Sequence, residues 1–282
     1  MTALRVCVLL ALASCGDHES TACDDGFCPP DTACGGAGVC LVEPRRCEGF
    51  AERTPCMVDD RARGTCAAAT CVPGVTITGG VVAVPNTPLP DVTASVRGHP
   101  EVRTDLTNIK GFFDLLDVPR DSAVLVELRY PDCVPVLTRP IVTRDENVFV
   151  DVLYGGIPIL SEAFFDLVSS QLGIGRTPGT AIIAGSTFDP MTGSALAGVT
   201  VAIEGVSCDG PFYFDRNGTP LLDTATDAES GVFGFGNCEL GPASLVATRA
   251  GVTCRTLDTS PGAVTLELVA DHLSFSGRIV CD

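Results

Sequence analysis

Apolar and polar residues alternate in short runs along most of the chain after residue 75. Clear examples are residues 92–96 and 148–152, and further on residues 199–203 and 264–268. A period of two puts one face of a strand against a core and the other face in solvent, as in antiparallel sandwiches. The pattern therefore predicts a mainly β protein in this part of the chain.

One segment, residues 161–173, departs from this alternation. Its large apolar residues recur at helical spacing: Phe164, Leu167, Val168 and Leu172. Ser161 can cap the start of a helix, and Arg176 to Gly179, which include a proline, would end it. We expect a short helix packed in a cleft between domains. A detachable helix that binds a partner is the alternative.

Two parts of the strand-rich region repeat each other. Residues 88–96 align with residues 195–203, and residues 107–113 match residues 226–233 with one extra residue. Residues 107–113 and residues 226–233 each hold a turn-forming Asn or Asp, then a Gly that tolerates a positive φ, then an aromatic residue that begins the next strand. The repeat predicts two units of one type.

The order of these motifs resembles the carboxypeptidase regulatory-like domain, a transthyretin-like β-sandwich. The two copies start at Gly80 and Gly185, and the first copy departs from the family pattern with Asp91 in place of Gly and Asn108 in place of Asp. Collagen-adhesin B-type repeats are the alternative sandwich. The resemblance implies two tandem antiparallel β-sandwiches after an N-terminal disulfide-rich module.

The positions of the two motif copies and of the expected helix divide the strand-rich region into three parts. The first sandwich takes residues 75–155, a linker with the short helix takes residues 156–178, and the second sandwich takes residues 179–282.

The N-terminus has the features of an export signal. Arg5 is followed by the apolar residues 6–13, a run too short to span a bilayer. Leu12, Ala13, Ser14 and Cys15 look like the lipobox of bacterial lipoproteins. This resemblance implies a signal peptide at residues 1–14, a lipid on Cys15, a tether at residues 15–22 and a place in the cell envelope, at the outer membrane or cell surface. An ordinary secretory signal or a start site placed too late is the alternative.

Residues 23–73 hold eight closely spaced cysteines and few large apolar residues: Cys23, Cys28, Cys34, Cys40, Cys47, Cys56, Cys66 and Cys71. Such a segment cannot build an ordinary core, so disulfides must restrict the unfolded chain instead. Zinc binding is the rival interpretation, but the segment has no C-x-x-C pair and no His. We expect a disulfide-rich module whose pairing the sequence does not reveal.

Five more cysteines lie in the strand-rich region. Their order favours pairing Cys208 with Cys238 and Cys254 with Cys281, which leaves Cys133 as the odd one. An odd cysteine outside the cell is free, bound to a partner, or paired across domains.

The charge and the known motifs exclude several functions. With 18 Lys and Arg against 35 Asp and Glu, the net charge is −17, so a nucleic-acid-binding face is not expected. The three histidines, His18, His99 and His272, begin no zinc-peptidase motif, and no G-x-S-x-G or P-loop is present. We expect no enzyme, no metal and no cofactor, with an enzyme of unfamiliar type as a remote alternative.

The longest turn-rich insertion, residues 207–223, lies in the second sandwich. Tyr213 and Phe214 suit a contact surface, so we place a possible binding loop there. The alternative is that both rings fold back onto the sheet. The acidic residues that follow favour a solvated loop over a calcium site.

These observations predict a lipid-anchored cell-envelope protein with a non-catalytic binding or scaffolding role. Its partners would be the membrane, through the lipid, and an unknown envelope protein or glycan. Carbohydrate binding through a starch-binding-like sandwich is the alternative, although the chain offers no Trp and only three tyrosines: Tyr130, Tyr154 and Tyr213.

Overall fold

The computed structural model divides the chain into two compact units, Met1–Pro73 and Gly74–Asp282. It describes residues 21–23, 26–28, 32–34, 40–42, 47–51, 54–58, 63–67, 69–84, 86–144, 146–150, 156–221, 223–256 and 264–281. The expected signal peptide, Cys15 and most of the tether lie outside the described residues.

The first unit is a set of short strands joined by disulfides. Strands β1 (Thr21–Cys23) and β2 (Gly26–Cys28) pair with each other. A five-stranded sheet follows in the order of the chain: β3 (Thr32–Cys34), β4 (Cys40–Val42), β5 (Pro55–Met57), β6 (Arg63–Ala67) and β7 (Thr70–Pro73).

Disulfides make up most of the core of this unit. The structure pairs Cys28 with Cys40, Cys47 with Cys66, and Cys56 with Cys71. The sulfur atoms of Cys47, Cys56 and Cys71 lie within 4.8 Å of one another, but all three are bonded in disulfides. The expectation of a disulfide-rich module is therefore confirmed, since these sulfurs are not thiolates that could bind zinc.

The second unit is built on one ten-stranded sheet. Along its main path the strands are β11 (Asp105–Leu106), β10 (Thr93–Val96), β14 (Val126–Arg129), β15 (Val136–Thr138), β28 (Leu273–Val280), β19 (Ala181–Thr187), β23 (Val232–Cys238), β21 (Asp209–Phe214) and β22 (Pro220–Leu221), and β26 (Arg255–Thr256) pairs with β28.

Smaller sheets complete the unit. In the first repeat they contain β8 (Val75–Ala83), β9 (Thr87–Pro88), β12 (Phe112–Val118), β17 (Val148–Val150) and β18 (Ile157–Ile159), and a separate pair, β13 (Ala123–Val124) and β16 (Ile141–Val142). In the second repeat they contain β20 (Val199–Glu204), β24 (Gly241–Arg249), β25 (Val252–Thr253) and β27 (Val264–Leu268). Each repeat has its own buried core.

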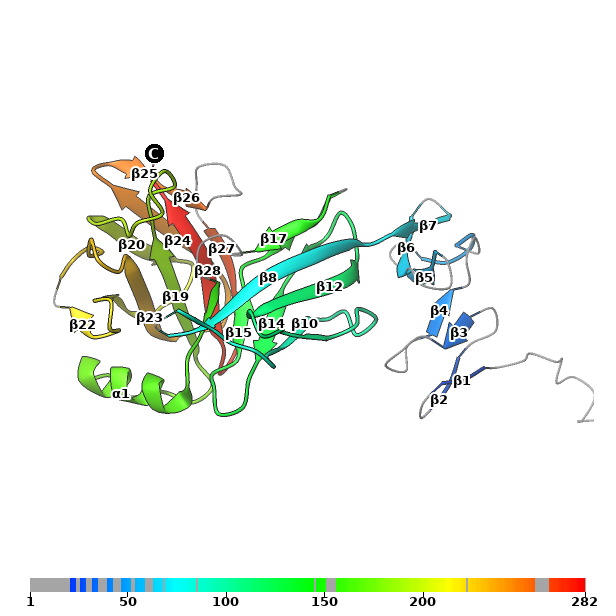
Figure 1. The fold of residues 1–282 in the computed structure, drawn as a ribbon, viewed down its shortest axis with the longest axis horizontal. Coiled ribbons are helices and arrows are strands. Elements are labelled where there is room, and N and C mark those ends of the chain that lie inside the picture. The colour runs from blue at the N-terminus through cyan, green and yellow to red at the C-terminus, as the bar shows by residue number, and fades with distance from the viewer. Residues whose placement is uncertain are drawn as a thin grey trace, which may run out of the picture. The chain divides into compact units, whose positions relative to one another are not determined.

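The last strand, β28, joins the two repeats. It pairs in parallel with β15 of the first repeat on one side and with β19 of the second repeat on the other (Figure 1). Leu273 and Phe275 belong to the core of the first repeat, whereas Ile279 belongs to that of the second. The sandwiches are therefore one fused unit with mixed sheets, because one strand completes both cores.

The segment expected as a linker is partly structural. Its first residues form β18, which pairs in parallel with β8 from Ile157 opposite Val81 to Ile159 opposite Ala83. The beginning of this segment therefore belongs to the first repeat, since its two isoleucines are buried there.

The expected helix is present as α1 (Glu162–Leu172). Ser161 accepts a hydrogen bond from the backbone N–H of Phe164 at 3.1 Å, and Gly173 ends the helix in the left-handed region at φ 68°. Leu167 is 56% exposed, although it was expected on the buried stripe. The other three residues of that stripe, Phe164, Val168 and Leu172, lie on the packed side of the helix together with Phe165. Within the described ranges, no helix is long and apolar enough to cross a membrane.

Candidate functional site: an apolar groove under the helix

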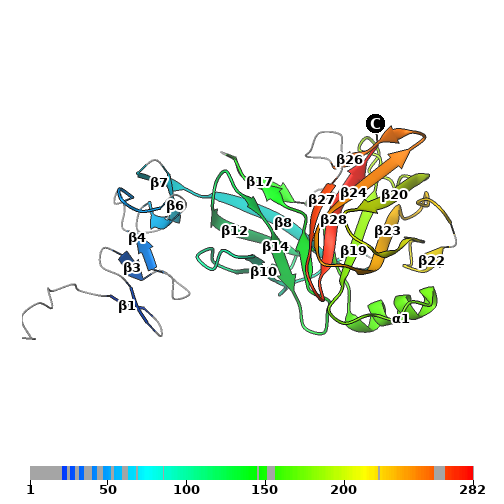
Figure 2. The same cartoon turned by 180° about the vertical axis from the view of Figure 1, so that it is seen from behind.

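Helix α1 lies along the second-repeat part of the large sheet, beside β23 and β22 in both views (Figures 1 and 2). Between the helix and the sheet is a groove of about 290 Å³. This volume is at the lower end of the range for small-molecule sites, which is roughly 300–1,000 Å³. We call this hollow the α1 groove.

The strand register sets the floor of the groove in three rows, because directly paired residues face the same side of a sheet. The inner row holds Ile182 and Leu273, the middle row holds Phe275, Ala184, Gly234 and Phe212, and the outer row holds Arg278, Ser186, Val232 and Phe214. The floor therefore changes from fully apolar to partly polar toward its outer row.

Glycines in β23 make room for the groove. A Cβ atom on Gly236 would lie 2.9 Å from the Cδ1 atom of Ile174, and one on Gly234 would lie 3.4 Å from the ring of Phe214. A side chain at either position would fill the space below the helix. The roof is formed by the apolar face of α1, mainly Phe165 and Val168.

Asn237 fixes the chain that leaves the helix. Its amide nitrogen donates to the carbonyl oxygen of Gly175 and to a carboxylate oxygen of Asp209, both at 2.9 Å. Its amide oxygen accepts from the backbone N–H of Thr177 at 2.9 Å. At the other end, Arg176 forms an ion pair with Glu162. The Asn237 contacts hold the segment after α1 to β23, and the Arg176–Glu162 pair links that segment to the first turn of the helix.

Charged side chains occur only at the rim among the described lining residues. They are Asp215, Arg216, Glu229 and Arg278. Arg216 and Glu229 pair at 3.7 Å. Hydrogen bonds from the backbone of Thr219 and Asn217 lower the pKa of Asp215 and hold its carboxylate in the turn. The guanidinium of Arg278 lies 5.6 Å from the ring centroid of Phe188.

The possible binding loop at Tyr213 and Phe214 stays a prediction, but the structure shows where the two rings lie. The insertion forms strands β21 and β22 rather than an open loop, and Tyr213 is 1% exposed in the core of the second repeat. Its hydroxyl oxygen accepts from the backbone N–H of Val201 at 3.1 Å. Because side chains alternate along a strand, Phe214 points to the opposite face and lines the groove.

This arrangement gives no tyrosine platform for a sugar among the described residues. Tyr213 is in the core, Tyr130 is half-buried beside a second hollow, and Tyr154 lies outside the described residues. The groove is lined by phenylalanines instead.

The remaining predicted residues have structural positions. The structure contains the Cys208–Cys238 and Cys254–Cys281 disulfides, the pairing that their order favours. Cys133 is a free cysteine that lines the second hollow, near the start of α1. Burial raises the pKa of its thiol, and the neighbouring carboxylates of Asp132 and Glu162 add to this. A raised pKa makes the thiol a poor nucleophile.

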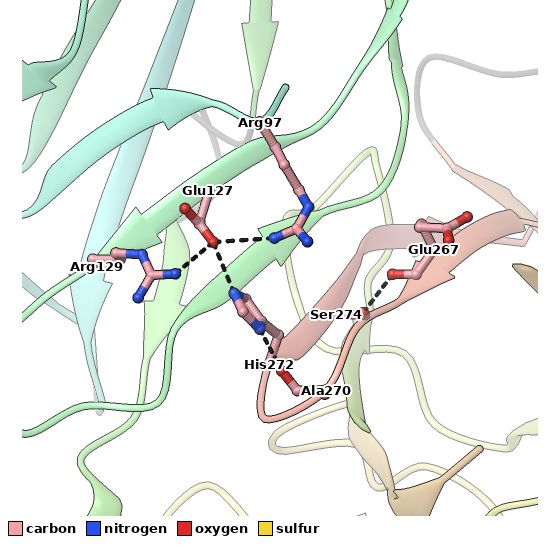
Figure 3. A network of polar contacts seen from close by, with 7 residues as sticks. All are labelled: Arg97, Glu127, Arg129, Glu267, Ala270, His272 and Ser274. Atoms are coloured by element: carbon pink, nitrogen blue, oxygen red, sulfur yellow. Dashed lines mark hydrogen bonds and ion pairs between the residues drawn. The ribbon is translucent and has the colours of Figure 1, made fainter. Parts of the chain in front are cut away.

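A polar network fastens the two repeats together. Figure 3 shows Arg97, Arg129 and His272 converging on one carboxylate oxygen of Glu127, at 3.4, 2.9 and 2.8 Å. The other ring nitrogen of His272 lies 2.7 Å from the carbonyl oxygen of Ala270. The sequence showed no role for His272, because its partner is distant along the chain.

The charges of this network govern the pKa of Glu127. Burial would raise that pKa, but the hydrogen bonds and positive charges of Arg129 and His272 outweigh burial and lower it. His99 lies instead in a surface turn, 2.7 Å from Glu101. We find no arrangement of these groups suited to catalysis in the part of the chain that the structure describes.

Comparisons with known proteins give fold similarities only. No protein-family model matches the chain, and no curated protein matches it. Similar solved structures include a type II cohesin–X-dockerin complex from Acetivibrio cellulolyticus, at 17% identity and a TM-score of 0.26 over 31% of this chain and 58% of that chain. The Bacillus anthracis TIE protein matches at 11% identity and a TM-score of 0.25, over 81% of this chain and 42% of that one. The shaft pilin SpaA from Lactobacillus rhamnosus GG matches at 13% identity and a TM-score of 0.22, over 74% and 98%. At such TM-scores these similarities carry no argument about function.

Proposed function

We propose that this chain is a lipid-anchored cell-envelope protein that binds a small apolar molecule without chemical change. The observation that supports binding is the α1 groove, whose inner and middle rows are apolar and whose volume suits a small molecule. The anchor is supported by the sequence from Leu12 to Cys15. The disulfides are typical of proteins in an oxidising compartment.

A small molecule is a better occupant than a peptide segment. The groove is about 290 Å³, and α1 already covers this part of the sheet and is held through the segment that follows it. A helix or a strand of a partner would have to displace α1, whereas a compact apolar molecule would fit below it.

A titration with the neutral fluorescent probe N-phenyl-naphthylamine tests this function. The full chain is used with Cys15→Ser, so that no lipid competes for the probe. We expect saturable binding, and at least about a tenfold loss in Ala184→Leu, because the new side chain fills the middle row. The matched control is Ala202→Leu, at an exposed position of β20. Equal binding by both variants, or no saturable binding, would contradict the function.

Mass spectrometry of the mature N-terminus tests the anchor separately. We expect a diacylated or triacylated Cys15 as the first residue in a bacterial host that processes lipoproteins. A secreted, unmodified polypeptide that begins beyond Cys15 would contradict the anchor but not the groove.

A further inference from the structure

We infer that the α1 groove selects an uncharged ligand and rejects the anionic analogue that has the same aromatic skeleton. This inference rests on the proposed function and names the chemical class of ligand for the same site. It follows from where the charges of the groove lie and from how they are already used.

The rows that would enclose the ligand carry no charged group. The inner and middle rows contain aliphatic and aromatic side chains and one glycine, and the roof adds further apolar groups of α1. A charged ligand atom placed there would be removed from water with no opposite charge beside it, and burying an unpaired charge is strongly unfavourable.

The rim offers no surplus charge of either sign. It carries two carboxylates and two guanidiniums. Arg216 and Glu229 pair with each other, the Asp215 carboxylate accepts hydrogen bonds of its own turn, and the Arg278 guanidinium lies over the ring of Phe188. The four rim charges sum to zero, so the rim gives a ligand carboxylate or sulfonate no net attraction.

The charge of the whole chain acts in the same direction. The net charge of −17 creates a negative potential around the protein, which lowers the local concentration of anions. The outer row still offers the hydroxyl of Ser186, so one uncharged polar group on the ligand can be accommodated at the mouth.

The experiment compares two probes that share an aromatic skeleton. N-phenyl-naphthylamine is neutral, and anilinonaphthalene sulfonate carries a sulfonate in addition. Each is titrated into the full chain with Cys15→Ser, with Ala184→Leu measured in parallel to identify the signal that comes from the groove. We expect the neutral probe to bind at least about tenfold more tightly, the cost of an imperfectly paired charge.

A surface variant tests the role of the rim. Glu229 is well exposed, so Glu229→Arg should leave the fold unchanged while it breaks the pair with Arg216 and makes the rim positive. We expect the sulfonate probe to bind several-fold more tightly to this variant, because the rim then attracts anions.

The outcomes separate this inference from the proposed function. Equal or tighter groove binding of the sulfonate probe in the unmodified rim would overturn the inference and leave the binding function standing. An unchanged sulfonate affinity in Glu229→Arg would also overturn it. Absence of groove binding by both probes would overturn the binding function as well.

Discussion

Single residues in this protein take roles that depend on contacts far along the chain. Glu127 and His272 are an example, since they are 145 residues apart and meet at 2.8 Å. Tyr213 is another example. It lies in the segment predicted to hold a binding loop, yet its ring is buried in the core and its hydroxyl oxygen accepts a hydrogen bond from the backbone N–H of Val201. Composition and spacing do not reveal such pairings, because the pairing depends on sheet register.

The Glu127 network predicts a specific loss of stability in acid. A carboxylate whose pKa is lowered on folding stabilises the native state above its unfolded-state pKa, and this contribution disappears as the pH falls through the folded-state pKa. Glu127→Gln should therefore lower the free energy of unfolding by about 1–3 kcal/mol near neutral pH. The difference from the unchanged protein should close as the pH falls below about 4.

Urea unfolding of both proteins across this pH range checks the prediction. Glu204→Gln is the control, because that residue lies at an exposed position of β20. A difference for Glu127→Gln that stays constant from neutral pH into acid would contradict the network as described.

Local sequence patterns predicted the helix and the strands, but they did not predict how these elements pack. The alternation predicted strands correctly, as in β10 and β27, where every second residue is buried. Ser161 marked the start of α1 correctly. Of the predicted helical stripe, Phe164, Val168 and Leu172 lie on the side that packs. Leu167 is exposed instead and Phe165 is covered, because both are apolar and only the sheet decides which one packs.

The attachment of α1 to the sheet can be weakened at Asn237. This residue has φ 46°, so Asn237→Gly removes the amide without straining the backbone. We expect faster amide hydrogen exchange in residues 162–180, by about tenfold, because the bonds to Gly175 and Thr177 are lost.

Hydrogen exchange with mass spectrometry measures this effect. Asn108→Gly, in an exposed turn of the first repeat where its amide oxygen accepts from the backbone N–H of Lys110, is the control and should leave exchange in residues 162–180 unchanged. If Asn237→Gly exchanges like the control, the tail of α1 is held by other contacts, and this account of the groove is incorrect.

At the scale of the whole molecule, the two compact units differ in what stabilises them. The unit Gly74–Asp282 has two apolar cores joined through β28. The unit Met1–Pro73 has a small core made mostly of cystines. The repeat in the sequence predicted two sandwiches, but not their fusion, since nothing in the pattern of Leu273–Val280 shows that one strand pairs with both repeats.

This difference predicts the order of proteolysis after reduction. The disulfide-rich unit should be digested first, because its folded state depends on cross-links, and a fragment that begins near Val75 should persist. N-terminal sequencing of the fragments in reductant identifies the order. Equal resistance of both units in reductant would show that the first unit does not depend on its disulfides.

Ligand binding in the α1 groove can be followed with a tryptophan placed in its lining. The chain contains no Trp, so Phe214→Trp provides a single fluorophore at the groove, and Phe149→Trp provides one at a position that is 68% exposed on β17. Bromobenzene is a neutral apolar molecule that quenches tryptophan fluorescence only at short range. We expect saturable quenching in Phe214→Trp and weak, linear, collisional quenching in Phe149→Trp. Linear, unsaturable quenching of the same strength in both variants would contradict a binding site in the groove.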